Sequence, residues 1–242
     1  MQSLSAADVL NLWEHGAGYH AIDQALLVLS HVFPEHDYEY LATLSLGQRD
    51  GLLIEVHRRA FGDSLDAYTE CPECQEPLEF SLSCALLAGD LIPREMLTKT
   101  VTIQGGDFIL RAPNSRDAAA AAASENLDAA RRVLLTLCAT PGGGSGQDID
   151  ALPEPTQAVI AGELAAMDSR AETLLDLVCP ACAHAWQGIF EIMTFLWTAI
   201  RVRARRLLQE VDVLARVYGW TETNILAMSE TRRGLYVQMA MA

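Results

Sequence analysis

Two short cysteine motifs constrain the fold of this chain more than any other feature of its sequence. The motifs are Cys71-Pro-Glu-Cys74 and Cys179-Pro-Ala-Cys182, and each lies between short apolar runs. The matched flanks predict one unit that occurs twice, with a strand, a tight turn that carries two thiols, and a second strand. Two such thiol pairs supply the four sulfur ligands that zinc prefers in a closed tetrahedral site. We therefore predict a structural zinc ion bound by Cys71, Cys74, Cys179 and Cys182.

Other chemistries of the same cysteines stay open at this point. A redox dithiol needs one reactive pair rather than two. Disulfides need an oxidising compartment, and the first residues have no secretory-signal pattern. An iron site of the rubredoxin type usually has Gly directly after the second Cys, where this chain has Gln75 and Ala183. His184 is a further candidate ligand, but four sulfurs already complete a site, so we expect it at the surface. Cys84 and Cys138 lie outside the motifs and are predicted to be small buried residues.

The composition indicates an ordered globular protein with an acidic surface. Of its 242 residues, 50% are hydrophobic and 20% are charged, and the formal net charge is −15. Such a charge repels nucleic-acid phosphates and anionic lipid, so we do not expect nucleic acid as a partner. No apolar run reaches the roughly 18 uncharged residues of a membrane span. We therefore expect a soluble, cytoplasmic protein.

Helical periodicity dominates outside the cysteine motifs, so we predict an α+β fold that is mainly α-helical. The N-terminal helical unit is predicted over residues 1–64. Its first helix follows Ser5 and Asp8, which have the spacing of a capping box. A second helix is predicted over residues 21–32, and a third from Ser45 to Gly62.

The two halves of the split zinc ribbon, residues 65–83 and 173–190, enclose an inserted segment at 84–172. A metal bound by both halves would tie the two ends of this insertion together. Its predicted elements are, in order, a β-hairpin around Gly105-Gly106-Asp107, one alanine-rich helix from Asn114 to about Cys138, a flexible glycine-rich loop at 141–147, and a helix at 154–167.

The C-terminal unit, residues 191–242, is predicted to consist of one long helix and a short helical module. Apolar residues recur at spacings of four and three up to Val217 or Tyr218, a seam about 40 Å long. Gly219 is a predicted C-cap, and Thr221 and Ser229 are predicted N-caps. A basic cluster lies on the long helix at Arg201, Arg203, Arg205 and Arg206. Either it is a solvated face that pairs with local acids, or it docks an acidic partner.

The last third of the chain resembles the baseplate-hub assembly proteins of T-even-like contractile-tailed phages, prophages and extracellular contractile injection systems. The residues that carry the resemblance are the block Tyr218-Gly219-Trp220-Thr221-Glu222 before Ile225-Leu226, the pair Arg232-Arg233 with Tyr236, and the entry Phe195-Leu196-Trp197. The two cysteine motifs also fit longer members. The resemblance implies a part in building or forming a tail baseplate, with other baseplate or tail proteins as partners.

The residues themselves favour a protein without catalytic activity. The sequence has no spaced Ser/His/Asp set, no phosphate-binding loop and no metal site with an open position, so we expect no small-molecule substrate. The first hypothesis is a non-enzymatic assembly factor or component of a contractile-tail baseplate, which acts in the cytoplasm or becomes part of the tail particle. The alternatives are a zinc-ribbon adaptor in a bacterial regulatory complex and a zinc hydrolase. Aromatic and Arg residues supply much of the energy at interfaces, so the predicted partner contacts are Trp220, Arg232, Arg233 and Tyr236.

Overall fold

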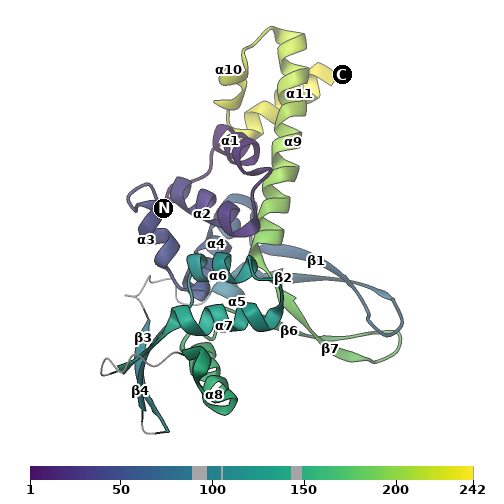
Figure 1. Ribbon diagram of the computed structural model, residues 1–242. Coiled ribbons are helices and arrows are strands. Elements are labelled where there is room, and N and C mark those ends of the chain that lie inside the picture. Colours follow the sequence, from purple (N-terminus) through teal and green to yellow (C-terminus); the bar gives the residue numbers. More distant parts are fainter. Residues whose placement is uncertain (89–96, 105, 143–148, 242) are drawn as a thin grey trace.

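The computed structural model describes residues 1–88, 97–104, 106–142 and 149–241. They form an α+β fold in which helices predominate, with a long helix in the C-terminal region, as predicted. Figure 1 shows this helix as an upright rod with the N-terminal helices along one side. Two β-ribbons extend sideways from its lower end, and the inserted segment lies below. Most of the predicted glycine-rich loop, residues 143–147, lies outside the described residues.

Four helices form the N-terminal unit. They are α1 (Ala6–Gly16), α2 (Ala21–Val32), α3 (Tyr38–Thr43) and α4 (Leu46–Phe61). The predicted capping box is present, because the Ser5 hydroxyl accepts from the Asp8 N–H and the Asp8 carboxylate accepts from the Ser5 N–H at 2.8 Å. Helix α3 is absent from the sequence prediction, because six residues are too few to show a helical period. It is fixed by Asp37, whose carboxylate accepts from the Tyr40 N–H at 2.7 Å.

Helix α9 (Ile192–Tyr218) runs for 27 residues and carries the predicted apolar seam. Its fully buried residues include Leu196, Ile200, Ala204, Leu207 and Leu214. Gly219 ends the helix with φ at 67°, a left-handed conformation that glycine adopts without steric cost. Two short helices, α10 (Glu222–Leu226) and α11 (Glu230–Met241), then fold back onto α9.

Two antiparallel hairpins form the ribbons beside the lower end of α9. Their strands are β1 (Ser64–Glu70) with β2 (Pro77–Ser83), and β6 (Thr173–Val178) with β7 (Ala185–Phe190). Alternate side chains of each hairpin are more buried, which is the two-residue period of a strand with one covered face. At their roots, Leu65 and Phe190 join the core that the N-terminal helices share with α9. Helix α5 (Cys84–Ala88) follows β2 and packs in the same core.

The inserted segment has a core of its own. Its elements are β3 (Thr98–Ile103), β4 (Gly106–Arg111), α6 (Ser115–Ala122), α7 (Leu127–Cys138), β5 (Ala139–Pro141), the short 3₁₀ helix η2 (Ile149–Ala151) and α8 (Glu154–Met167). Strands β3 and β4 form the predicted hairpin, and β5 pairs with the other edge of β4. Phe108, Leu110 and Ile160 are buried between this small sheet and its helices.

The prediction of one alanine-rich helix from Asn114 to Cys138 is wrong, because the chain forms two helices there. Helix α6 ends at Ala122, and Asn126 starts α7. The Asn126 side chain accepts from the Ala129 N–H at 2.9 Å, so it caps a new helix instead of continuing the old one.

The end of the insertion is joined to the N-terminal unit by hydrogen bonds as well as by the ribbons. The Asp168 carboxylate accepts from the Gly47 N–H at 2.8 Å, which satisfies a free donor in the first turn of α4. Arg170 donates to the carbonyl of Leu87 at 2.8 Å and to that of Ala88. Among the helices of the described residues, none combines the length and apolar character that a membrane crossing requires.

Gly47→Ala should destabilise the protein, because there is no room for a side chain at this junction. An added Cβ would lie 2.2 Å from the Asp168 Oδ1 and 3.0 Å from the backbone nitrogen of Ala171. We expect the free energy of unfolding in urea to fall by about 1–3 kcal/mol, despite the better helix propensity of Ala. Gly234→Ala in α11 is the matched control, since nothing lies within 4 Å of its added Cβ. That control should gain up to about 1 kcal/mol; equal effects of the two substitutions would contradict the prediction.

Candidate metal centre

The two cysteine motifs form turns of the same conformation at the tips of the two hairpins. In the first, the Cys71 N–H donates to the Glu76 carbonyl at 3.0 Å, and the Gln75 N–H donates to the Cys71 carbonyl at 2.9 Å. In the second, the Cys179 N–H donates to the His184 carbonyl at 2.9 Å, and the Ala183 N–H donates to the Cys179 carbonyl at 3.0 Å. The duplicated unit that the sequence predicts is therefore present in backbone detail.

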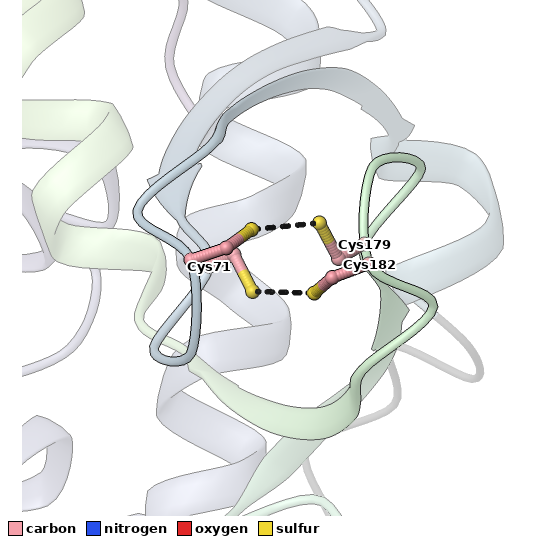
Figure 2. A group of neighbouring side chains, drawn as sticks. Cys71, Cys179 and Cys182 are labelled. Atoms are coloured by element: carbon pink, nitrogen blue, oxygen red, sulfur yellow. Dashed lines mark hydrogen bonds between the residues drawn. The ribbon is translucent and has the colours of Figure 1, made fainter.

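The structure brings all four predicted cysteines together, although about a hundred residues separate the motifs. Figure 2 shows the sulfurs of the two turns facing one another. The Cys71 and Cys182 sulfurs are 3.7 Å apart, the Cys74 and Cys179 sulfurs are 3.6 Å apart, and all four lie within 4.8 Å of one another. All four thiols are free, so neither pair is a disulfide in this structure.

This arrangement fits a metal with four thiolate ligands. Zinc binds thiolate sulfur at about 2.3 Å, which places the corners of its tetrahedron about 3.8 Å apart. The two sulfur separations, 3.7 and 3.6 Å, are close to that edge. His184 is not part of the cluster, because its ring stacks on Trp186 at 6.0 Å between centroids. The four cysteines can therefore hold a metal ion.

The first cysteine of each turn is buried and has a lowered pKa. The N–H groups of Cys182 and Ala181 donate to the Cys179 sulfur. They outweigh burial, which acts in the opposite direction, and lower the pKa of Cys179 to about 7. Burial raises the pKa of Cys71. Hydrogen bonds from the backbone of Cys74 and of Glu73 outweigh burial, so the pKa of Cys71 is lowered overall. Backbone donors therefore favour the thiolate form at both buried positions.

The second cysteine of each turn is exposed and has a raised pKa. The N–H of Glu76 lowers the pKa of Cys74, but the surrounding sulfurs and burial raise it to about 12. The N–H of His184 and the Cys74 sulfur lower the pKa of Cys182, but burial and the sulfurs of Cys179 and Cys71 outweigh them and raise it. Four thiolates so close together repel one another, and a bound divalent cation supplies the charge that favours all four.

Gln75 and Ala183 occupy the position after the second cysteine and have left-handed backbones, with φ at 62° and 60°. This is the place where the rubredoxin-type pattern has Gly, and the conformation explains that preference. A residue with a Cβ costs about 1–2 kcal/mol in this region relative to its usual conformation. Both turns therefore contain backbone strain that glycine would relieve.

The predicted partner residues lie at the opposite end of α9 from the ribbons. Trp220 stacks on Tyr218 at 4.6 Å between centroids and meets Tyr236 edge-on at 4.9 Å. The exposed Arg232 guanidinium lies 5.7 Å from the centroid of the Tyr236 ring, over its face. Tyr218, which the sequence prediction omits, completes this partly exposed cluster through an edge contact with Tyr236 at 5.9 Å.

Arg233 lies in the interior rather than beside these residues, with 1% of its surface exposed. Its Nε donates to the Glu210 carboxylate of α9 at 2.5 Å, and its Nη1 donates to the Met228 carbonyl at 2.9 Å. Glu210 also accepts from Arg206 at 2.9 Å. The guanidinium is therefore used within the chain, where it holds α11 against α9, and we correct the prediction that Arg233 lies at a partner contact.

One other cysteine lies close to a histidine, but this pair is not built as a nucleophile. The Cys84 sulfur is 3.6 Å from the Nδ1 of His57, and both residues are buried. Burial raises the pKa of Cys84 and lowers that of His57, so both side chains favour their neutral forms. Cys138 is also buried, which raises its pKa to about 12. Both cysteines are small core residues, as the sequence predicts.

Replacing Gln75 or Ala183 with Gly should stabilise the turns, because glycine removes the left-handed strain. We expect the free energy of local opening to rise by about 0.5–1 kcal/mol, measured by hydrogen exchange of the ribbon amides. Ala181→Gly lies in the same turn at a residue without positive φ, so it should have the opposite effect. Faster exchange in the Gln75→Gly and Ala183→Gly variants would contradict the prediction.

Comparison of this chain with protein-family models, with curated proteins and with solved structures finds no match.

Proposed function

We propose that the four cysteines bind one zinc ion and that this ion has a structural role. The observation that supports the proposal is the pair of cross-turn sulfur separations, 3.6 and 3.7 Å, close to the edge of a zinc–thiolate tetrahedron. Two-stranded hairpins are marginally stable alone in water, and each ribbon here has only two strands. A metal held by both tips offsets this weakness. Four sulfur ligands leave no position for a substrate, so the site supports architecture rather than catalysis.

We further propose that the protein is a non-enzymatic assembly factor or component of a contractile-tail baseplate. The support comes from the residues that resemble the baseplate-hub family and from their position. Trp220, Tyr236 and Arg232 form a partly exposed aromatic and cationic cluster at the far end of α9. Residues of these types often dominate binding energy at protein interfaces. The proposed contact with a baseplate protein is therefore Trp220, Tyr236 and Arg232, without Arg233.

Metal content tests the first proposal. Protein purified without chelator should contain one zinc per chain, and Cys71→Ser or Cys179→Ser should lose it. Metal removal should speed hydrogen exchange in residues 64–83 and 173–190 far more than in α9, because the ribbons lose their link. The matched control is Cys138→Ala, a change outside the cluster that should keep the metal even if it destabilises the core. Zinc below about a tenth of an equivalent in the unaltered chain would refute the proposal.

Co-purification with tail proteins tests the second proposal. In cells that express a full tail gene cluster, Arg232→Glu should abolish recovery of baseplate proteins and leave the melting temperature within a few degrees. Arg131→Glu, at another exposed arginine, is the matched control and should bind normally. Arg233→Met should instead lower stability by about 2 kcal/mol, because Glu210 loses a buried partner. Unchanged recovery of tail proteins by Arg232→Glu would refute the proposed contact.

A further inference from the structure

The four clustered cysteines form two pairs, and each pair joins an exposed residue of one turn to a buried residue of the other. Cys74 and Cys182 are exposed, whereas Cys71 and Cys179 each have 1% of their surface exposed. The Cys74 sulfur lies 3.6 Å from that of Cys179, and the Cys182 sulfur lies 3.7 Å from that of Cys71. Figure 2 shows both contacts running from one hairpin to the other. Each thiol that solvent can reach therefore has an enclosed thiol of the opposite ribbon beside it.

This combination of an accessible and an enclosed thiol suits a two-step oxidation. A peroxide converts an accessible cysteine to sulfenic acid, and a second thiol close by then condenses with that group. The sulfur separations of 3.6 and 3.7 Å exceed the length of a disulfide bond, so each pair must close by about 1.6 Å. Hairpins of two strands are marginally stable alone, so the two tips can approach each other by this distance.

Closure within one turn is less favourable than closure between the turns. In the first turn, the Cys71 N–H donates to the Glu76 carbonyl, and the Cys71 carbonyl accepts from the Gln75 N–H. The second turn has the same two hydrogen bonds. A disulfide within a turn has to fit this fixed backbone, and poor geometry strains the bond. A disulfide between the turns needs only a shift of one ribbon relative to the other.

The two remaining cysteines of the chain lack these conditions. Cys84 has 0% and Cys138 has 1% of its surface exposed. The Cys84 sulfur lies 3.6 Å from the Nδ1 of His57, and neither cysteine belongs to the group of four close sulfurs. Both residues are therefore internal controls for oxidation of the cluster.

We propose that the cluster is a site of peroxide oxidation that closes into two disulfides between the ribbons, Cys74–Cys179 and Cys71–Cys182. The exposed sulfur of each pair attacks hydrogen peroxide, the O–O bond breaks, and a sulfenic acid and one water form. The enclosed thiol of the opposite turn attacks the sulfenic sulfur, so that the S–S bond forms, the S–O bond breaks and a second water leaves. For each pair, two thiols are oxidised by two electrons and one peroxide is reduced to two waters.

Oxidation and metal binding exclude each other, and this part of the inference rests on the proposed zinc site. Zinc is bound by thiolate sulfur, and a disulfide sulfur no longer has that charge. The disulfides connect the same two tips that a metal would connect, so the ribbons stay joined when the ion is released. The pairing of the cysteines does not depend on zinc, because it follows from the positions and the exposure of the sulfurs.

Peptide mapping after oxidation tests the pairing. The zinc content of the unaltered chain is measured first, and the chain is then treated with two molecules of hydrogen peroxide per chain. Acid stops disulfide exchange, and pepsin cleaves the oxidised protein. Links between residues 64–83 and 173–190 should be at least about tenfold more abundant than links within either segment. Bound zinc should be lost in proportion to the disulfides formed, and Cys84 and Cys138 should remain thiols.

Two single variants separate the possible pairs. Cys74→Ser should form the disulfide between Cys71 and Cys182 and leave Cys179 as a thiol. Pairing within turns would instead join Cys179 to Cys182 and leave Cys71 free. Cys182→Ser should form only the disulfide between Cys74 and Cys179. Cys138→Ala, outside the cluster, is the matched control and should form both disulfides. If a variant fails to fold, the map of the unaltered chain still tests the proposal.

Three results would overturn the proposal. The first is a map in which links within the turns, or a link between Cys71 and Cys179, predominate. The second is a cluster that stays as four thiols or gains only sulfinic and sulfonic acids. The third is oxidation of Cys84 and Cys138 as readily as of the cluster. A zinc-containing chain with any of these results keeps the proposed metal site and loses this inference, whereas a zinc-free chain that forms both disulfides does the reverse.

Discussion

The apolar seam of α9 is the constraint on which the rest of the structure depends. Helices α1, α2, α4, α10 and α11 all pack against this one helix. Leu196 and Ile200 lie in the core shared with the N-terminal helices, and Leu214 is fully buried further along the rod. Because β7 leads directly into α9, the second ribbon is fixed at the base of the same rod. The inserted segment is the exception, since its core is separate. It is joined to the N-terminal helices by the Gly47–Asp168 hydrogen bond, by the bridge between Ser45 and Asn114, and by the packing of α6 against α2 and α3.

The helical body and the two ribbons differ in what stabilises them. The first ribbon, residues 64–83, can therefore carry five acidic side chains and no Lys or Arg. The body gains its stability from apolar burial, which does not depend on where surface charges lie. The ribbons bury little and have only two strands each, so a metal held by the cluster at their tips would strengthen them. Buried polar groups are used where elements must be aligned. Arg233 with Glu210 fixes α11 on α9, and Arg111 with Asp117 joins β4 to α6 within the insertion.

Local patterns in the sequence were enough to predict most of the helices, the hairpins and the cysteine cluster. Ser5 with Asp8, and the left-handed Gly219, act through neighbours in the chain, so their roles are readable from spacing. Long-range partners are not readable in this way. Arg232 and Arg233 are adjacent and chemically identical. Arg232 is exposed, whereas Arg233 is buried and donates to the carboxylate of Glu210, 23 residues earlier. The break at Asn126 was missed for a different reason, because alanine-rich sequence on both sides favours helix and a single side-chain hydrogen bond decides the boundary.

The position of the cysteine cluster determines what a metal there can influence. Cys71 and Cys179 are buried, but Cys74 and Cys182 are exposed at the ribbon tips, away from both cores. A metal bound there would add little to the packing of the helices, and it would mainly fix the position of one ribbon relative to the other. The two ribbons have different surfaces. The outward side of the first ribbon is acidic, whereas the second ribbon exposes the apolar residues Leu174, Val178 and Ile189. Fixing the two tips to each other keeps both surfaces in a set orientation to the α9 rod. A metal bound at the tips would therefore act on the orientation of the two ribbons rather than on the packing of the helices.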